Sequence, residues 1–497
     1  MFDFNELFIF EMANNHQGNV QHGINIIKTY STLAKKYNIK AAIKLQFRHY
    51  DTFIHPHSIQ DTENKKVERF LSTRLSDKEQ KMLVDTIKQE GLLCMVTPFD
   101  ERSVDLINKL DVDIIKIGSP SLHDFKLFEK ISITQKPIIV SSGGCDITHI
   151  DKLVSFFKNR HNDFALMHCV SKYPCENSDL DLHTLTQLKA RYPTLPIGFS
   201  THEEPSNFST IGIAYGMGAR LFEKHVGLPT ETITLNKYSV NPDQADTWLS
   251  AFVEAKKMVG HTRIISHKEK QDLHLLYRGV FFNKDIAKGQ IITDADIYFA
   301  FPLREGGILT GEFTSGTVAD KNYTKDAYVP QSLASKQSSV LHEYIHKIKG
   351  VLNEKNIKIP HDSKIEISHH YGIENIFTYG CTIITIINGD EYCKKYIVML
   401  KGQKHPSHYH IKKDETFFVL AGSVNVLIND TTKKTLHETD ILRIPRYTKH
   451  SFSANDEDVI FEEISTRHFN NDSIYSDITI SSKDRDSRKT YLYNWII

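Results

Sequence analysis

Two histidines end short apolar runs: His202 closes Ile197–His202, and His225 closes Phe222–His225. In a β/α barrel the carboxyl ends of the strands meet at one mouth, so we expect both imidazoles there. Two imidazoles can hold a divalent metal and leave positions open for water or substrate, as a catalytic site requires. The pair therefore predicts a metal site that polarises a bound carbonyl group.

Other polar residues end or follow the remaining apolar runs of the first half. They are Glu11, Lys44, Gln46, Thr97, Lys116, Ser119, Ser141, Ser171, Tyr173 and Ser200. For any one of them a structural role is the simpler interpretation. Burying an unpaired charge costs several kcal/mol, however, so charged groups on successive strands indicate a ligand. Lysines and hydroxyls suit phosphate or carboxylate oxygens, and a carboxylate such as Glu11 could handle a proton. The set predicts a small, doubly anionic substrate that reacts with a carbonyl compound.

The elements that must position these residues are short β-rich runs alternating with helical patterns, which is typical of βα units. The runs are Leu7–Ala13, Ala41–Phe47, Leu92–Pro98, Ile114–Ser119, Pro137–Ser142, Phe164–Val170, Pro196–Thr201 and Arg220–Val226. Amphipathic segments between them include Val20–Tyr37, Asp77–Glu90, Glu101–Leu110 and Pro242–Val259. Eight such units favour a closed (β/α)₈ TIM barrel over residues 1–262, hence the α/β class.

Composition excludes several classes of protein. A chain of 497 residues predicts two or three domains. Lys+Arg and Asp+Glu both number 61, so the chain lacks the excess of basic residues that is typical of nucleic-acid-binding proteins. We find no apolar run near the ~20 residues of a membrane span, and the first residues do not resemble a signal peptide. The six cysteines form no CxxC pair, so we expect a reduced, cytoplasmic protein.

Short motifs along the barrel resemble the sialic acid synthase family. The matching stretches are Phe10–Gly18, Ile43–Gln46, Thr97–Phe99, Ile115–Ser119, Ser141–Gly143, Leu166–Cys169, Tyr173–Pro174, Gly198–His202 and Glu223–His225. Each is weak alone, but they occur in family order and cover the whole barrel. The resemblance implies an enzyme that condenses phosphoenolpyruvate with an N-acylated hexosamine, giving a nonulosonic acid for surface carbohydrate.

The resemblance also implies roles for single residues. Those expected to hold phosphoenolpyruvate are Lys44, Thr97, Lys116, Ser119, Ser141 and Ser200, with Ser171 in place of a family Asn. Gln46 and Tyr173 would line the sugar pocket, and His202 and His225 would bind Mn²⁺, Mg²⁺ or Co²⁺. Glu11 would handle a proton or support a cationic centre. Leu235 aligns with a family Asp that touches the sugar, so we expect an acceptor other than N-acetylmannosamine.

A small β-rich module is predicted over residues 277–320. Its Lys284–Gly289 stretch resembles the antifreeze-like (SAF) domain, which in the family covers the partner subunit's active site. The resemblance implies a domain-swapped homodimer, with Arg304 replacing the family arginine that reaches the sugar. A plain packing module is an equal alternative. Residues 321–375 are expected to form a linker and a short helix.

A second metal constellation lies in a predicted cupin domain, residues 376–470. The first cupin motif, G-x5-HxH-x4-E-x6-G, is matched by Gly402, His408, His410, Glu415 and Gly422. The second is matched by Pro445 and His450, while Thr439, Tyr447 and Ala454 replace its Gly, Gly and Asn. His408, His410, Glu415 and His450 suit Fe²⁺, Mn²⁺, Ni²⁺ or Zn²⁺. The tail, residues 471–497, has no assignment.

Three functions stay open at this point. The first is the synthase acting on phosphoenolpyruvate and an aldose. The second is a metal-dependent sugar isomerase or epimerase centred on the cupin, because several metal-binding cupins are of that kind. The third is a non-catalytic carbohydrate-binding protein with two vestigial sites. The intact lysines and barrel histidines favour the first.

Overall fold

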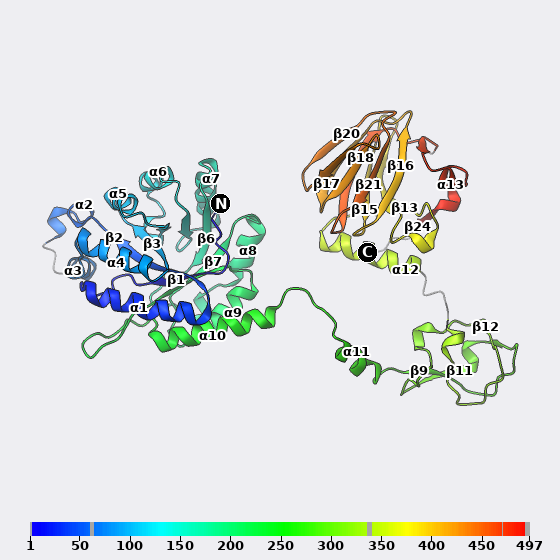
Figure 1. Cartoon of the computed structure of the whole chain (residues 1–497), viewed down its shortest axis with the longest axis horizontal. Helices are drawn as coiled ribbons and strands as arrows, with labels where there is room; N and C mark the ends of the chain where they lie inside the picture. The colour runs from blue at the N-terminus through cyan, green and yellow to red at the C-terminus, as the bar shows by residue number, and fades with distance from the viewer. Residues whose placement is uncertain (1, 60–63, 335–339, 470, 493–497) are drawn as a thin grey trace. The chain divides into compact units, whose positions relative to one another are not determined.

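The computed structural model describes residues 2–59, 64–334, 340–469 and 471–492. Contacts divide the chain into two compact units, Met1–Ile264 and Ile265–Ile497 (Figure 1). Residues 335–339 of the predicted linker and 493–497 of the predicted tail lie outside the described part. Within that part, no helix is both long and apolar enough to cross a membrane.

The first unit contains a closed barrel of eight parallel strands in sequence order, which confirms the predicted TIM barrel. The strands are β1 (Leu7–Glu11), β2 (Lys40–Phe47), β3 (Leu93–Pro98), β4 (Ile114–Ile117), β5 (Ile138–Ser141), β6 (Phe164–Cys169), β7 (Ile197–Thr201) and β8 (Leu221–His225). Several end before the predicted runs do. At β1, for example, Ala13 already has φ 47°, outside the extended region.

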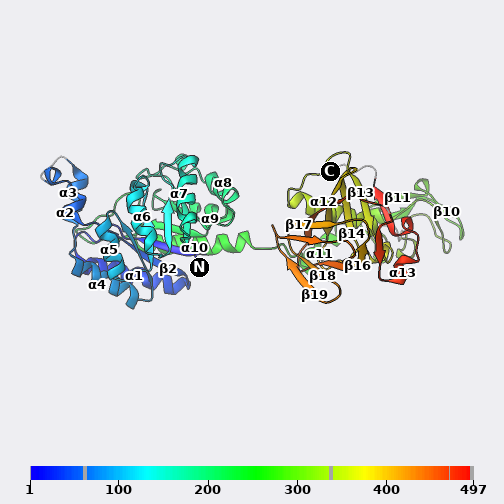
Figure 2. The ribbon, with the colours of Figure 1, turned by 90° about the horizontal axis from the view of Figure 1, so that it is seen from above.

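Helices surround the barrel (Figure 2). They are α1 (Val20–Tyr37), α2 (Tyr50–Phe53), α3 (Lys65–Ser72), α4 (Asp77–Gln89), α5 (Glu101–Lys109), α6 (Phe125–Ile133), α7 (Ile147–Asn159), α8 (His183–Arg191), α9 (Ser209–Gly216) and α10 (Pro242–Val259). A capping box of Asn241 and Gln244 begins α10, with Pro242 in its first turn. The Trp248 ring of α10 packs edge-on against Phe8 of β1, with ring centroids 5.8 Å apart.

The barrel interior is built in layers, because every second residue of a strand points inward. An apolar layer includes Ile9, Ala42, Met95, Ile114, Ile139, Met167 and Leu221. Two positions further along these strands stand Glu11, Lys44, Thr97, Lys116, Ser141, Cys169 and Glu223. Strand register places Glu11 beside both Lys44 and His225, and Ser200 beside Glu223. The barrel interior therefore changes from an apolar layer to a polar layer over two residues of each strand.

The second unit begins with α11 (His267–His274) and a small β module. Its strands are β9 (Gly279–Phe282), β10 (Ile291–Ile292), β11 (Ile297–Ala300) and β12 (Thr317–Val318). Tyr323, Val329 and Leu333 belong to the module's core, so it extends beyond residue 320, where we predicted a linker. We missed this extension because the stretch is mostly polar and its three core residues are widely spaced in sequence.

The cupin domain consists of a seven-stranded and a five-stranded antiparallel sheet. The first, in spatial order, is β20 (Ile441–Ile444), β17 (Glu415–Ala421), β22 (Val459–Thr466), β15 (Tyr392–Met399), β14 (Cys381–Asn388), β13 (Lys364–Ser368) and β24 (Lys489–Leu492). The second is β19 (Thr432–Leu436), β18 (Val424–Ile428), β21 (His450–Ala454), β16 (Lys404–His410) and β23 (Ser473–Tyr475). Two helices, α12 (Val340–Glu354) and α13 (Ile478–Ser481), accompany them.

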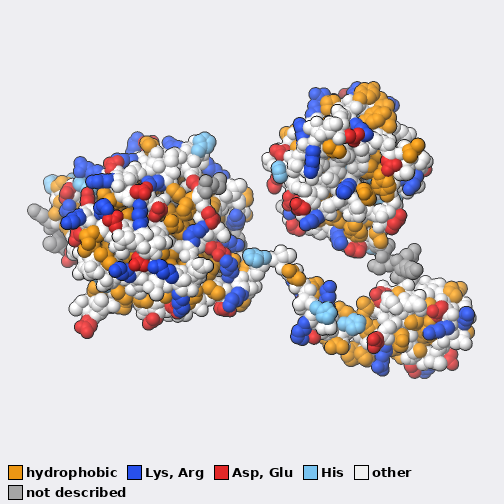
Figure 3. Space-filling view, viewed as in Figure 1, with side chains coloured by type: hydrophobic (Ala, Val, Ile, Leu, Met, Phe, Trp, Pro, Cys, Tyr) orange, Lys and Arg blue, Asp and Glu red, His pale blue; other side chains and the backbone are white. Residues whose placement is uncertain are grey.

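The predicted cupin limits, 376 and 470, are too narrow. Strand β13 precedes them, and β23 and β24 lie in the tail that had no assignment. Strands this short carry little periodicity of their own, and their pairing partners lie far away in sequence. In Figure 3, acidic and basic side chains mix over the visible surface, in keeping with the equal totals of 61.

Candidate active site and metal centre

The barrel mouth holds a cavity of about 560 Å³. Its lining includes eleven of the predicted site residues: Glu11, Lys44, Gln46, Thr97, Lys116, Ser119, Ser141, Tyr173, Ser200, His202 and His225. Ser171 is exposed at the cavity edge, and Arg304 belongs to the second unit. The polar layer of the barrel interior and the adjoining carboxyl ends of the strands therefore supply nearly all of the predicted site residues to one cavity.

Buried ion pairs cover the floor of this cavity. Glu223 lies 2.9 Å from the Lys44 ammonium and 2.7 Å from that of Lys116, and it accepts a hydrogen bond of 2.9 Å from Ser200. Glu11 pairs with Lys44 from the other side. Sequence reasoning noted Glu223 but gave it no role. Its partner Lys116 lies across the barrel, which strand spacing alone cannot reveal.

Burial affects the protonation of Lys44 and of its partner Glu223. Burial, opposed by the Glu223 carboxylate and assisted by the nearby Lys116 charge, lowers the pKa of Lys44 to about 7. Burial opposes ionisation of Glu223, but Lys116 and Lys44 hold its pKa well below the usual range. An anion bound here would favour the charged form of Lys44.

Hydroxyl groups gather around Gly143. A methyl group at this glycine would lie 2.3 Å from Ser171 Oγ and 2.4 Å from Ser119 Oγ. Only glycine therefore leaves room for two hydroxyls to face one space. Together with Ser141 and Thr97 in the cavity lining, they form a set of donors suited to phosphate oxygens.

The barrel histidines have the protonation state that a metal requires. His202 Nδ1 donates to the Val170 carbonyl at 3.0 Å, which leaves Nε2 as a lone-pair ligand. Burial lowers the pKa of His202 to about 4 and that of His225 well below its ordinary value. Their ring centroids are 5.2 Å apart, and His225 Nδ1 is buried without a hydrogen bond. The two imidazoles therefore fit a shared divalent ion.

Aromatic rings flank this pair. Tyr173 lies 4.2 Å from His202 between ring centroids, and Tyr238 lies 5.0 Å from His225. Leu235, which we aligned with a sugar-binding Asp, packs over Gly227 and is not among the lining residues, whereas the neighbouring Asn236 is. This loop therefore presents the Asn236 amide, and not Leu235, to the cavity.

The cupin brings three histidines into one buried cluster, His408, His410 and His450, whose ligand atoms all lie within 4.8 Å of one another. Their Nδ1 atoms donate to the carbonyls of Pro406, Asp472 and Thr448 at 3.1, 3.1 and 3.0 Å. Each Nε2 is thereby left for a ligand. Such backbone contacts fix the tautomer and orientation of metal-binding histidines.

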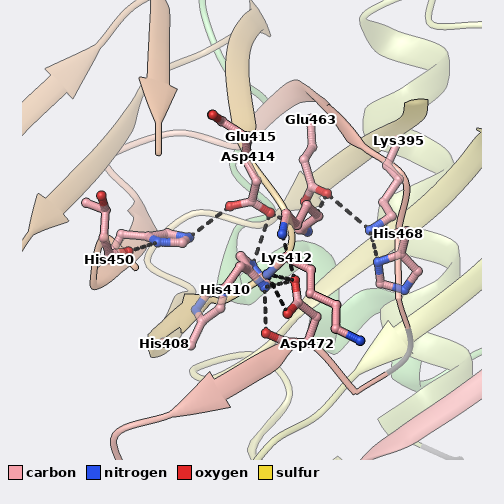
Figure 4. Close-up of polar contacts among 12 residues, drawn as sticks. Lys395, His408, His410, Lys412, Asp414, Glu415, His450, Glu463, His468 and Asp472 are labelled. Carbon is pink, nitrogen blue, oxygen red and sulfur yellow. Dashed lines mark hydrogen bonds and ion pairs between the residues drawn. The ribbon is translucent and has the colours of Figure 1, made fainter. Parts of the chain in front are cut away.

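The fourth predicted ligand, Glu415, points towards two of these rings (Figure 4). Its oxygens lie 3.2 Å from the Nε2 atoms of His410 and His450, yet these nitrogens have no hydrogen-bond partner. Lone pairs facing lone pairs at this distance repel each other unless a cation lies between them. Lys413 also pairs with Glu415. The donor set fits a divalent metal.

A closed (β/α)₈ barrel with paired lysines, clustered hydroxyls and neutral histidines at its mouth defines a barrel enzyme acting on an anionic substrate. Residues 32–263 match the NeuB family, and residues 395–465 match the cupin domain. An uncharacterized protein of Methanocaldococcus jannaschii is 31% identical over 309 residues, which cover 60% of this chain and 85% of that protein. The chain belongs to the NeuB family, is an enzyme of that family, and carries a C-terminal cupin domain.

Named relatives give the family's chemistry. The N,N'-diacetyllegionaminic acid synthase of Campylobacter jejuni is 26% identical over 343 residues, covering 65% of this chain and 98% of that protein. The solved structure of a spore coat polysaccharide biosynthesis protein E from Chromobacterium violaceum shares 40% identity at a TM-score of 0.63. It covers 66% of this chain and 98% of that one. The expected family and fold class are thus confirmed.

Proposed function

We propose that the barrel condenses phosphoenolpyruvate with an open-chain, N-acylhexosamine-like aldose, giving a nonulosonic or related 3-deoxy-ulosonic acid and phosphate. The observation that carries the proposal is the cavity floor, where Lys44 and Lys116 lie beside clustered hydroxyls and next to two neutral imidazoles. This arrangement suits a phosphate and carboxylate held beside a polarised carbonyl. Relatives named as legionaminic and pseudaminic acid synthases support the same chemistry.

The steps follow from the positions of these groups. A divalent ion such as Mn²⁺, held by His202 and His225, would polarise the aldehyde. Carbon 3 of phosphoenolpyruvate bonds to the aldehyde carbon, whose oxygen takes a proton and becomes a hydroxyl. Glu11, which pairs with Lys44, supports the positive charge at carbon 2 and accepts a proton from the water that adds there. Cleavage of the bond between carbon 2 and the phosphate oxygen releases phosphate and leaves a 2-oxo acid.

Phosphate release from phosphoenolpyruvate, with Mn²⁺ and a panel of aldoses, tests this proposal. We expect at least one aldose to give release in the native chain. Glu11→Gln, which keeps the shape but loses the charge, should reduce the rate about 10²-fold or more. The proposal is overturned if no aldose supports release, or if the Glu11→Gln chain works at the native rate.

The small module supports a second part of the proposal, in which two chains form a dimer and Arg304 reaches the partner's acceptor sugar. The Arg304 side chain is exposed, and only its backbone carbonyl has a contact, with Gly307 N at 2.9 Å, among the described residues. Mixing Glu11→Gln with Arg304→Ala subunits tests it. If Arg304 acts across the dimer, mixed dimers regain one intact site and hence activity. Absence of complementation would contradict action in trans.

The cupin site also supports a metal centre of its own, with His408, His410, His450 and Glu415 holding Fe²⁺, Mn²⁺, Ni²⁺ or Zn²⁺. A sugar isomerase or epimerase is the second candidate function, favoured by the buried Nε2 atoms that lack partners. Metal analysis of the purified chain should find an ion that is lost in a His408→Ala/His410→Ala double variant. Phosphate release by the barrel should survive that change, because the ligands belong to separate units.

A further inference from the structure

An arginine with two unsatisfied hydrogen-bond donors lies at the outer end of the barrel cavity. Arg48 follows β2, two residues beyond Gln46 and four beyond Lys44, and it lines the same cavity. Its side chain is buried, with the residue only 7% exposed, and Nη2 donates to Gln46 Oε1 at 2.9 Å. Nε and Nη1 are buried and have no hydrogen bond. Two donors of a charged group are therefore without a hydrogen bond in a residue that borders both the barrel cavity and a neighbouring cavity lined by Arg74.

Packing alone does not account for this guanidinium. It lies 3.8 Å from the Phe99 ring centroid and 4.2 Å from that of Phe70. Contact with aromatic faces stabilises a cation, but it satisfies no N–H group in the guanidinium plane. Each buried donor without an acceptor lowers the stability of the fold. An acceptor that enters the plane between the rings removes that cost.

Helix α3 adds two more cations to the same rim. Lys66 and Arg69 line the cavity from exposed positions. Among the residues that the structure describes, neither they nor Arg48 form an ion pair. The rim's lining acid is Asp124, and its carboxylate caps α6 by accepting from Leu127 N at 3.1 Å. The outer end of the cavity therefore carries an excess of positive charge.

The inner end of the cavity is a separate site. There Lys44 and Lys116, which we propose hold phosphoenolpyruvate, pair with Glu11 and Glu223. Arg48 is four residues from Lys44 along β2, which corresponds to about 13 Å of extended chain. The cavity thus has lysines paired with carboxylates at its floor and three cations without ion pairs, among the described residues, at its rim, and the two histidines share the same lining.

We infer that the acceptor aldose carries an anionic group, a phosphate or a carboxylate, at the end remote from its aldehyde, and that Arg48, Lys66 and Arg69 bind it. The inference rests on the proposed condensation, because that reaction places the aldehyde beside the histidines. An arginine presents two parallel N–H groups to such an anion, and two further cations at the rim strengthen its attraction. A neutral acceptor would leave the rim charge and the Arg48 donors unmatched.

Matched pairs of sugars test the inference on the full chain with Mn²⁺ and phosphoenolpyruvate. The probes are N-acetylmannosamine and mannose, each compared with its 6-phosphate, and glucose compared with glucuronate. Binding is measured by calorimetry at low and high salt, and phosphate release is measured separately. We expect at least one charged member to bind ten-fold or more tightly than its neutral counterpart, with the preference shrinking in salt.

Variants locate the effect. Arg69→Gln changes an exposed residue, so this variant should fold normally. Its ratio of affinities for the charged and the neutral sugar should be five- to ten-fold smaller than that of the native chain. Arg48→Gln should lose more of this preference, and Arg48→Lys should keep part of it. Arg74→Gln is the control, because Arg74 pairs with Asp51 at 3.3 Å and is not among the residues that line the barrel cavity.

Each outcome decides a separate claim. Equal or tighter binding of the neutral sugars overturns the inference, as does a preference that survives both Arg48→Gln and Arg69→Gln. Preferred binding of the phosphate sugars over glucuronate identifies phosphate as the group, and the reverse identifies a carboxylate. If a charged sugar binds through these arginines but no sugar supports phosphate release, the anion site stands and the proposed condensation fails.

Discussion

Replacing Glu223 by Gln tests whether the cavity floor is held together by charge. This carboxylate is 3% exposed and is shared by Lys44 and Lys116, which are 5% and 1% exposed. The amide keeps the shape and a contact with Ser200 but removes the charge. Removing one partner of a buried pair costs about 3–5 kcal/mol, since the other charge stays buried. Glu11 still pairs with Lys44, so we expect a loss of about 3 kcal/mol in the free energy of unfolding.

The substrate should reverse this loss. Phosphoenolpyruvate brings negative charge to the same lysines, so it should stabilise the Glu223→Gln chain more than it stabilises the native chain. The measurement is urea unfolding with and without phosphoenolpyruvate, followed by Trp248 fluorescence in a Trp495→Phe background, because these are the two tryptophans of the sequence. Trp248 is buried in the barrel and therefore reports this unit alone.

Ser200→Ala provides the control, because it removes one hydrogen bond to Glu223 but no charge. It should cost only about 1 kcal/mol and leave the effect of phosphoenolpyruvate unchanged. Our account of the floor would be refuted if Glu223→Gln unfolded at the native urea concentration. It would also be refuted if phosphoenolpyruvate stabilised both chains equally.

Three further predictions concern other parts of the molecule. Burial lowers the pKa of His16 to about 4, so the unfolded chain binds more protons than the native chain between about pH 4 and 6.5. Stability should rise with pH there, and His16→Asn should flatten that rise by up to about 3 kcal/mol in denaturation curves. Asp472→Ala removes a carboxylate that accepts from the backbone of Ile411, Lys412 and Lys413, so titration should show about 10–100-fold weaker metal binding in the cupin. Thr439 has φ 75°, a strained conformation for a β-branched residue, and Thr439→Gly should raise the thermal midpoint through a gain of about 1 kcal/mol.

The barrel and most of its mouth could be predicted, because both rest on local patterns. Strands β1 to β8 all fall within or next to the predicted runs. A polar residue two positions beyond an inward apolar residue must share its face, as Glu11 does with Ile9. The ion pairs among these residues are a different matter. Lys116 and Glu223 are 107 positions apart, and only barrel closure brings them together.

Loops resisted prediction for the opposite reason. Between strands there is no repeat to fix which side chain faces a cavity, so the sequence cannot show which loop residue lines it. Leu235 was expected at the sugar site, yet Asn236 lines the cavity and Leu235 covers Gly227. Arg48 was missed because it follows the end of β2, where the inward alternation was assumed to stop. It nonetheless continues the series of Lys44 and Gln46.

The histidine clusters proposed as metal sites could be predicted, but the backbone groups that orient their rings could not. At both centres the deciding contact is a histidine Nδ1–H donated to a backbone carbonyl, from His202 to Val170 and from His410 to Asp472. Any residue can supply a carbonyl, so no motif records it. In the cupin that carbonyl belongs to the segment leading into β23, beyond the predicted end of the domain. The tail without an assignment therefore belongs to the proposed metal centre. The Asp472 carbonyl fixes the tautomer of His410, and the Asp472 carboxylate anchors the loop that follows β16.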